Sequence, residues 1–110
     1  MILLAASVAA PVKLILDTDM GGGNCDDVDD VGTLCMANAL ADSGEVELLA
    51  VVVNTMPPAC AGVVSVLQHF YGRDDVPIGT YHGGSPWNWR RSTYVPLLAD
   101  HWVKGARLDR

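Results

Sequence analysis

The segment from residue 17 to residue 30 is unusually rich in carboxylates. Six aspartates lie within these fourteen residues, at positions 17, 19, 26, 27, 29 and 30. Carboxylates this close together repel one another unless a cation neutralises them or one of them keeps a proton. Oxygen-only ligands favour a hard cation such as Ca²⁺ or Mg²⁺, and the segment lacks the set of His and Cys ligands that a transition metal prefers. The pattern therefore predicts a hard-cation site or a shared proton.

Part of this acidity has a simpler explanation. Asp26 is better explained as a solvated loop residue, and acids in the first turn of a helix are favourable without any ligand. Asp17 and Asp19 are different, because they follow an apolar strand run, where acids without partners are costly. These two residues are the stronger candidates for chemistry.

Short apolar runs alternate with helical patterns over the first 80 residues. We predict strands at residues 11–17, 45–54 and 74–80, and helices at residues 31–41 and 57–72. The strand runs are apolar enough to be buried on both faces. This order predicts an α/β fold, an open parallel sheet of right-handed βαβ units. Beyond residue 81 the pattern predicts a loop at 82–94 and a further helix at 95–108.

Sites in such sheets lie at the carboxyl ends of the strands. The first strand ends at Asp17 and is followed by Asp19, and the second ends at Asn54. We therefore expect these side chains to face one crevice.

Three familiar acidic or glycine-rich motifs fit this segment poorly. An EF-hand loop counted from Asp17 would place Gly21 and Val28 where an oxygen ligand and a bidentate Glu are needed. A phosphate-binding loop needs a Lys after its glycines, and Asn24 stands there. The opening LILDTD is also similar to the haloacid-dehalogenase phosphatases, but Gly21 departs from their pattern and they do not call for a second acid pair.

Both halves of the cluster resemble one family. DTDMG at residues 17–21 and DVDDVGTL at residues 27–34 are similar to the DTDxGNDxDDALAL motif of the inosine/uridine-preferring nucleoside hydrolases. The loop between the halves is longer here, and the resemblance extends from residue 14 to about residue 80. It implies a Rossmann-like core and the N-terminal portion of a purine nucleosidase-type enzyme of ribonucleoside catabolism.

The resemblance also implies roles for individual residues. Asp19 matches the acid that binds Ca²⁺ and activates the attacking water, and Asp30 matches the second carboxylate on that ion. Asp29 would hold a ribose hydroxyl, Asn54 would lie near metal and ribose, and Asp17 would support the site. The implied reaction is hydrolysis of the N-glycosidic bond of a nucleoside by a Ca²⁺-activated water, with free base and ribose as products.

Two alternatives stay open within this interpretation. The acid pair could be Asp26 and Asp27 instead of Asp29 and Asp30, although the helical residues after Asp30 favour the second pair. Family members are also longer and supply a further metal-binding Asp, a carbonyl ligand and ribose contacts from beyond residue 110. A truncated, non-catalytic βαβ module that binds a cation or a partner is therefore the competing hypothesis, and its sheet would have an apolar edge that invites pairing.

Composition limits the partners. The chain has 110 residues, 50% hydrophobic residues and a net charge of -6, which predicts one folded domain and argues against a nucleic-acid partner. Residues 12–110 would form this domain, and residues 1–11 resemble a leader without its positive charge, which favours a cytoplasmic protein over a secreted one. No apolar run is long enough to span a membrane. The resemblance makes a homo-oligomer an expectation.

The remaining candidates have weaker support. Three cysteines at positions 25, 35 and 60 show no CxxC spacing and are interpreted as buried or incidental thiols. His82 and His101 are interpreted as structural or exposed histidines. Trp87, Trp89 and Tyr94 are interpreted as a packed or partner-facing cluster, with a base pocket as the alternative.

Overall fold

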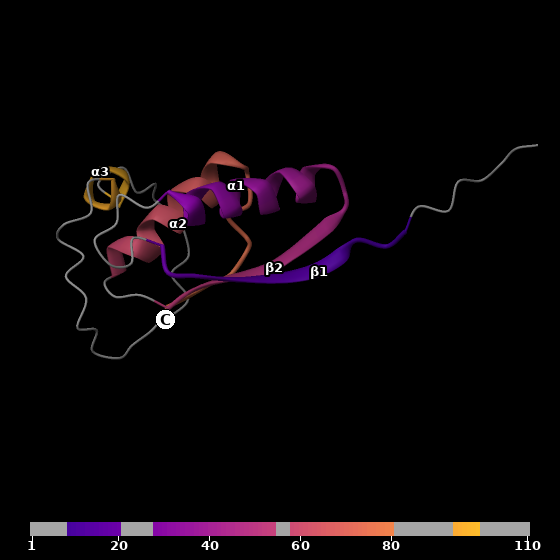
Figure 1. Cartoon of the computed structure of the whole chain (residues 1–110), viewed down its shortest axis with the longest axis horizontal. Coiled ribbons are helices and arrows are strands. Elements are labelled where there is room, and N and C mark those ends of the chain that lie inside the picture. Colours follow the sequence, from indigo (N-terminus) through magenta and orange to yellow (C-terminus); the bar gives the residue numbers. More distant parts are fainter. Residues whose placement is uncertain (1–8, 21–27, 55–57, 81–93, 100–110) are drawn as a thin grey trace, which may run out of the picture.

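The computed structural model describes residues 9–20, 28–54, 58–80 and 94–99. The elements alternate along the chain and are drawn in Figure 1. They are β1 (Val12–Thr18), α1 (Asp29–Asp42), β2 (Val46–Val53), α2 (Pro58–Phe70), β3 (Ile78–Thr80) and α3 (Val95–Ala99). The predicted α/β fold with βαβ units is confirmed. Most of the predicted helix at 95–108, and the segments at 1–8 and 81–93, lie outside the described residues.

The three strands form a parallel sheet in the order β1-β2-β3. Leu14 pairs with Leu48 and Ile15 pairs with Ala50, so Leu49 is an extra residue on the β2 side of the ladder. The third strand is shorter than the predicted 74–80. Val76 N–H donates to the Arg73 carbonyl at 3.2 Å, and this turn leaves only Ile78–Thr80 for pairing.

Both long helices lie on one side of the sheet (Figure 1). α1 packs mainly over β2, and α2 packs over β3 and β2. The core lies between these layers and consists chiefly of the apolar side chains of Leu34, Leu48, Val51, Val53, Cys60, Ala61, Val63, Val64 and Ile78, with Met20 and Val95 at its margin.

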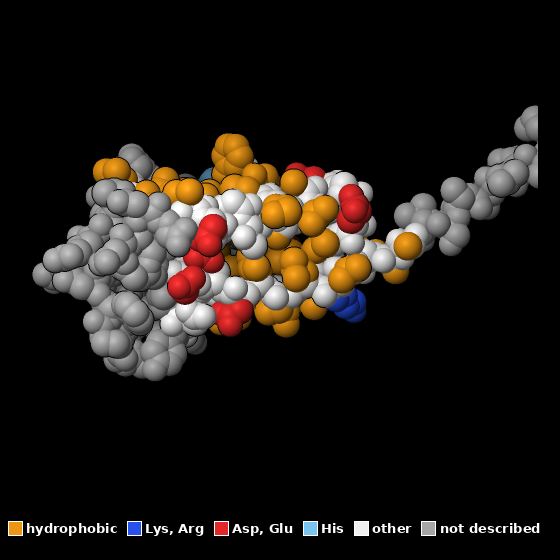
Figure 2. All heavy atoms as spheres, viewed as in Figure 1, with side chains coloured by type: hydrophobic (Ala, Val, Ile, Leu, Met, Phe, Trp, Pro, Cys, Tyr) orange, Lys and Arg blue, Asp and Glu red, His pale blue; other side chains and the backbone are white. Residues whose placement is uncertain are grey.

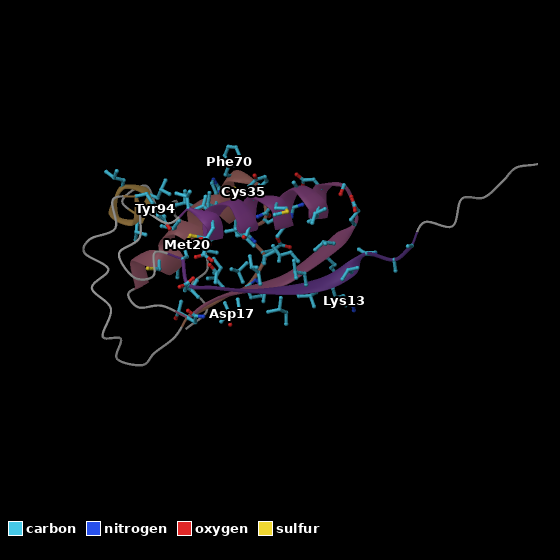
Figure 3. The ribbon with its side chains drawn as sticks, viewed as in Figure 1. Lys13, Asp17, Met20, Cys35, Phe70 and Tyr94 are labelled. Atoms are coloured by element: carbon cyan, nitrogen blue, oxygen red, sulfur yellow. The ribbon has the colours of Figure 1, made fainter. Side chains whose placement is uncertain are left out.

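The expectation that the strands are buried on both faces is wrong for the described part of the chain. Ile15 on β1 is 61% exposed and Leu49 on β2 is 38% exposed. Figure 3 shows Lys13 and Asp17 projecting from the sheet on the side away from the helices. An apolar run in the sequence indicates that a strand can be buried, but what covers its second face depends on other elements.

α1 and α2 end in the same way. Gly44 and Gly72 have φ angles of 77° and 69°, the left-handed region that favours glycine. Each glycine N–H donates to a carbonyl of the last helical turn, and the next residue donates to the carbonyl one position earlier, from Glu45 to Leu40 and from Arg73 to Gln68. This is the Schellman arrangement, and it turns the chain into the following strand.

The interface between α1 and α2 contains a buried polar pair. Asn38 Nδ2 donates to the Leu34 carbonyl at 2.9 Å and to Gln68 Oε1 at 2.7 Å. Both side chains are almost fully buried. Asn38 Oδ1, Gln68 Nε2 and the nearby Ser65 Oγ have no hydrogen-bond partner among the described residues. The pair joins the two helices but leaves one polar atom of each amide without a partner among the described residues, which is costly.

Within the described ranges, none of the helices combines the length and the apolar character that crossing a membrane requires.

Candidate functional site at the carboxyl edge of the sheet

The first two strands end side by side, and their last residues are tied together. Asn54 N–H donates to the Thr18 carbonyl at 3.0 Å, which extends the ladder by one residue. The Asn54 side chain then turns to Asp17, with 3.3 Å between Nδ2 and the carboxylate oxygen. The predicted proximity of Asp17 and Asn54 is therefore found at this edge, where Figure 2 shows acidic side chains gathered beside the start of α1.

A second contact links the end of β1 to the first turn of α1. Thr18 Oγ1 donates to Asp30 Oδ1 at 2.7 Å and accepts from Met20 N–H at 3.1 Å. Thr18 is only 3% exposed, because its side chain points towards the helices while Asp17 points away from them. The hydroxyl thus fixes both the chain after β1 and the carboxylate on α1.

Asp19 and Asp30 approach each other across this contact. Burial raises the pKa of Asp30, and the Thr18 hydroxyl opposes this by stabilising the carboxylate. A hydrogen bond to the Asp19 carboxyl and the like charges of Asp19 and Asp29 raise the pKa of Asp30 further. Two carboxyls eleven positions apart in the sequence are therefore close enough to compete for one proton.

Asp29 occupies the first turn of α1 in a different way. Its Oδ1 accepts the Asp30 N–H at 2.8 Å, whereas Val28 before it makes no side-chain cap. An acid here satisfies a helix N–H group and also meets the positive end of the helix dipole. Asp29 therefore has a structural role in addition to the ribose contact that the sequence resemblance implies.

The predicted site residues thus form two adjoining groups. Asp30 accepts from the Thr18 hydroxyl and interacts with Asp19 and Asp29 at the first turn of α1, while Asp17 and Asn54 pair at the exposed edge. In the part of the chain that the structure describes, no three His, Cys, Asp or Glu side chains are grouped so that they could hold a metal ion. Asp26 and Asp27, the alternative acid pair, lie outside the described residues.

Thr18 is a site residue to which the resemblance in sequence assigned no role. Its signal was nevertheless present in the sequence. Side chains alternate along a strand, so Thr18 points towards the helices if Asp17 before it points away. A buried hydroxyl at a strand end needs a partner, and the first turn of α1 supplies it.

Tyr94 packs against the core near the same edge. Its hydroxyl lies 3.8 Å from Met20 Sδ, and Figure 3 shows the two labelled side chains on the helix side of the sheet. This supports packing as its role. Cys60 is buried and Cys35 is half-buried, in keeping with the interpretation of both as core or incidental thiols. Cys25, His82, His101, Trp87 and Trp89 lie outside the described residues.

No protein-family model, curated protein or solved structure matches this chain at a significant level. The fold class is therefore defined by the strands, helices and parallel register alone.

Proposed function

We propose that the chain contributes to a hydrolase that cleaves the N-glycosidic bond of ribonucleosides with a Ca²⁺-activated water. The single observation that supports this most strongly is the approach of Asp19 to Asp30 at the carboxyl edge of β1. This edge is where α/β sheets place their ligands, and a close carboxyl pair needs a cation or a shared proton. The DTD and DVDD motifs make the cation the better choice.

The types of ligand atom at this edge are those that a hard cation prefers. Asp19 and Asp30 offer carboxylate oxygens, and Thr18 and Asn54 add a hydroxyl and an amide group at the same edge. Ca²⁺ takes six to eight oxygens, so further ligands must come from water, substrate or other residues. When bound, the cation would lower the pKa of a water and hold the ribose diol.

Individual side chains of this protein would then have separate roles in the reaction. Asp19 would accept the proton of the attacking water as general base. Asp29 would hold a ribose hydroxyl, and Asn54, fixed by its bond to Asp17, would orient the sugar at the sheet edge. Carboxylates nearby would stabilise the positive charge that develops on the ribose as the glycosidic bond breaks.

A second candidate function, a non-catalytic module that binds a cation or a partner, is favoured by one specific observation. The described residues contain no group of three metal-ligating side chains. Two carboxylates with waters would bind Ca²⁺ weakly and would not by themselves position a nucleoside.

The two proposals are separated by measuring base release and Ca²⁺ binding on the same samples. Release of free base from inosine and from uridine is followed with Ca²⁺ and with a chelator, for the wild type, Asp19→Asn and the exposed control Asp75→Asn. The hydrolase proposal expects Ca²⁺-dependent release that falls by at least about 100-fold in Asp19→Asn only. Activity that persists in Asp19→Asn would refute the role of this residue.

Ca²⁺ titration followed by calorimetry completes the test. Binding that is lost in Asp19→Asn and Asp30→Asn, without any base release by the wild type, would favour the non-catalytic module over the hydrolase. Absence of both binding and release would overturn the hydrolase proposal and the cation-binding form of the second candidate. Release of phosphate from a phosphomonoester instead of base from a nucleoside would point to the phosphatase alternative.

A further inference from the structure

β1 is an open edge of the described sheet, and it is the longer of the two edges. It has seven residues and pairs with β2 on one side only, whereas the opposite edge strand, β3, has three residues. Short edge strands resist further pairing, while long regular ones are templates for another strand. The extra residue at the β1-β2 pairing, Leu49, belongs to β2, so β1 itself remains regular.

The direction of the backbone groups along β1 can be read from its hydrogen bonds. Val12 N–H donates to the Glu45 carbonyl, and the Thr18 carbonyl accepts from Asn54 N–H, so both residues direct their polar groups at β2. Because this direction alternates along a strand, the N–H and C=O groups of Lys13, Ile15 and Asp17 point to the open edge. Three residues therefore present six backbone groups in a row.

The side chains of the same three residues point away from the helices and lie at the surface. Lys13 and Asp17 are exposed, and Ile15 between them is 61% exposed. Figure 3 shows Lys13 and Asp17 on this face, at opposite ends of the strand. Neither takes part in the two ion pairs of the described residues, His69–Asp74 and Arg73–Asp42. The edge thus has a positive charge, an apolar centre and a negative charge, evenly spaced.

We propose that β1 pairs with β1 of a second copy of this chain, antiparallel and centred on Ile15. In that register Ile15 lies opposite its own copy, and each Lys13 lies opposite the Asp17 of the other copy. All three residues that direct backbone groups outward then form hydrogen-bonded pairs. The sequence is self-complementary about Ile15, as a two-fold interface requires.

Neighbouring registers are poorer both in backbone hydrogen bonding and in the pairing of opposite charges. A shift by one residue pairs outward-directed backbone groups with inward-directed ones and breaks the ladder. A shift by two restores the parity but places one charged residue opposite Ile15 and the other opposite a residue beyond the end of β1. The centred register also pairs the full length of the strand, from Val12 opposite Thr18 to Thr18 opposite Val12.

The opposite face of β1 is compatible with the same pairing. Leu14 and Leu16 point towards the helix layer but are only half-buried, because α1 and α2 pack mainly over β2 and β3. In the centred register Leu14 of one copy lies opposite Leu16 of the other, so both would gain apolar neighbours. The result is a continuous six-stranded sheet with the helices of both copies on one face.

Charge reversal tests the partner and the register together. The molar mass of the 110-residue chain in solution is measured by sedimentation over a range of concentrations, for the wild type, Lys13→Glu, Asp17→Lys and the double variant with both changes. We expect a concentration-dependent dimer whose dissociation constant rises about tenfold in each single variant and returns towards the wild-type value in the double variant. Asp75→Lys, which makes the same charge change far from β1, should leave the dimer unchanged.

A backbone test uses the same readout. Ile15→Pro removes an N–H that points to the open edge, so the β1-β2 ladder keeps its bonds, and the dimer should be lost while the circular dichroism spectrum is retained. A wild-type chain that stays monomeric at high concentration overturns the proposal, and so does a dimer that both single charge variants leave intact. If Ile15→Pro does not fold, the charge-reversal series alone decides. Since every readout is molar mass, the outcome is independent of the proposed hydrolase activity.

Discussion

Thr18 and Asp30 are joined by a 2.7 Å hydrogen bond from a buried hydroxyl to a half-buried carboxylate. The bond links the end of β1 to the first turn of α1, two elements that are separated in the sequence by a long acidic segment. The same hydroxyl accepts from Met20 N–H. One side chain therefore sets the position of the candidate site relative to the sheet.

Replacing Thr18 by Val should weaken both the fold and the site. Valine keeps the branched shape but removes a donor to a carboxylate and an acceptor for a backbone N–H, and such losses cost about 1–3 kcal/mol of unfolding free energy. The pKa of Asp30 should rise, because the Thr18 hydroxyl lowers it. Urea unfolding measures the first effect, and the titration of the Asp30 carboxyl carbon by NMR measures the second.

Thr33→Val is the matched control, since Thr33 lies exposed on α1. It should change the unfolding free energy by no more than about 0.5 kcal/mol. Equal stability losses in the two variants would show that the Thr18 hydroxyl contributes nothing specific.

Asp30 should make the stability of the protein depend on pH in a definite direction. Its pKa is raised in the folded state, chiefly by burial and then by Asp19 and Asp29, so the folded chain binds this proton more tightly than the unfolded chain. The contribution to stability is therefore fully present below the ordinary Asp pKa of about 4 and is lost as the pH rises through the raised value. Above that pH, in the absence of Ca²⁺, Asp30→Asn should be more stable than the wild type.

The measurement is urea unfolding of both proteins across the acidic range with a chelator present. The advantage of Asp30→Asn should grow with pH and then level off. Asp19→Asn should reduce the pH dependence of the otherwise wild-type chain, because it removes one of the like charges that raise the pKa of Asp30. A stability difference between Asp30→Asn and the wild type that does not change with pH contradicts this account.

The order of the elements followed from local patterns in the sequence. The apolar runs before Asp17 and Asn54 became β1 and β2, the helical patterns at 31–41 and 57–72 became α1 and α2, and Gly44 and Gly72 follow the ends of these helices. These signals depend on periodicity and on backbone freedom, which are properties of a few neighbouring residues. The same holds for the meeting of Asp17 with Asn54, because parallel strands of similar length end together.

What the sequence did not reveal depends on contacts between distant segments. The exposure of Ile15 follows from the absence of a covering element among the described residues, and the extra residue Leu49 follows from how β2 pairs on β1. Asn38 and Gln68 are polar residues in predicted helices, and only the packing of α1 against α2 buries them. A residue's own type does not indicate such burial.

The Asn38–Gln68 pair should show strong energetic coupling. Asn38→Leu leaves Gln68 without its partner, and Gln68→Met leaves Asn38 with only the Leu34 carbonyl. Each single change should cost about 1–3 kcal/mol, because a buried polar group loses its hydrogen bond. The double variant should be more stable than either single one, since it also removes Asn38 Oδ1 and Gln68 Nε2, which have no partners among the described residues.

A double-mutant cycle by urea unfolding measures this coupling. Additive losses would mean that the two amides act independently and that the 2.7 Å contact contributes little. A double variant that is less stable than both single variants would show that the packing of the new apolar side chains, and not the hydrogen bonds, dominates at this position.

Replacing Gly32, within α1, and Gly44, just after its end, by alanine should change the unfolding free energy in opposite directions. Gly32 lies within the helix, and a Cβ added there would meet nothing within 4 Å. Gly32→Ala should therefore raise the unfolding free energy by about 1 kcal/mol, the difference in helix propensity. Gly44 also has open space around it, but its φ of +77° is unfavourable for any residue with a Cβ, and Gly44→Ala should lower the unfolding free energy by about 1–2 kcal/mol. Because neither site has a steric neighbour, thermal unfolding of the two variants isolates the backbone contribution, and changes of the same sign would contradict the assigned end of α1.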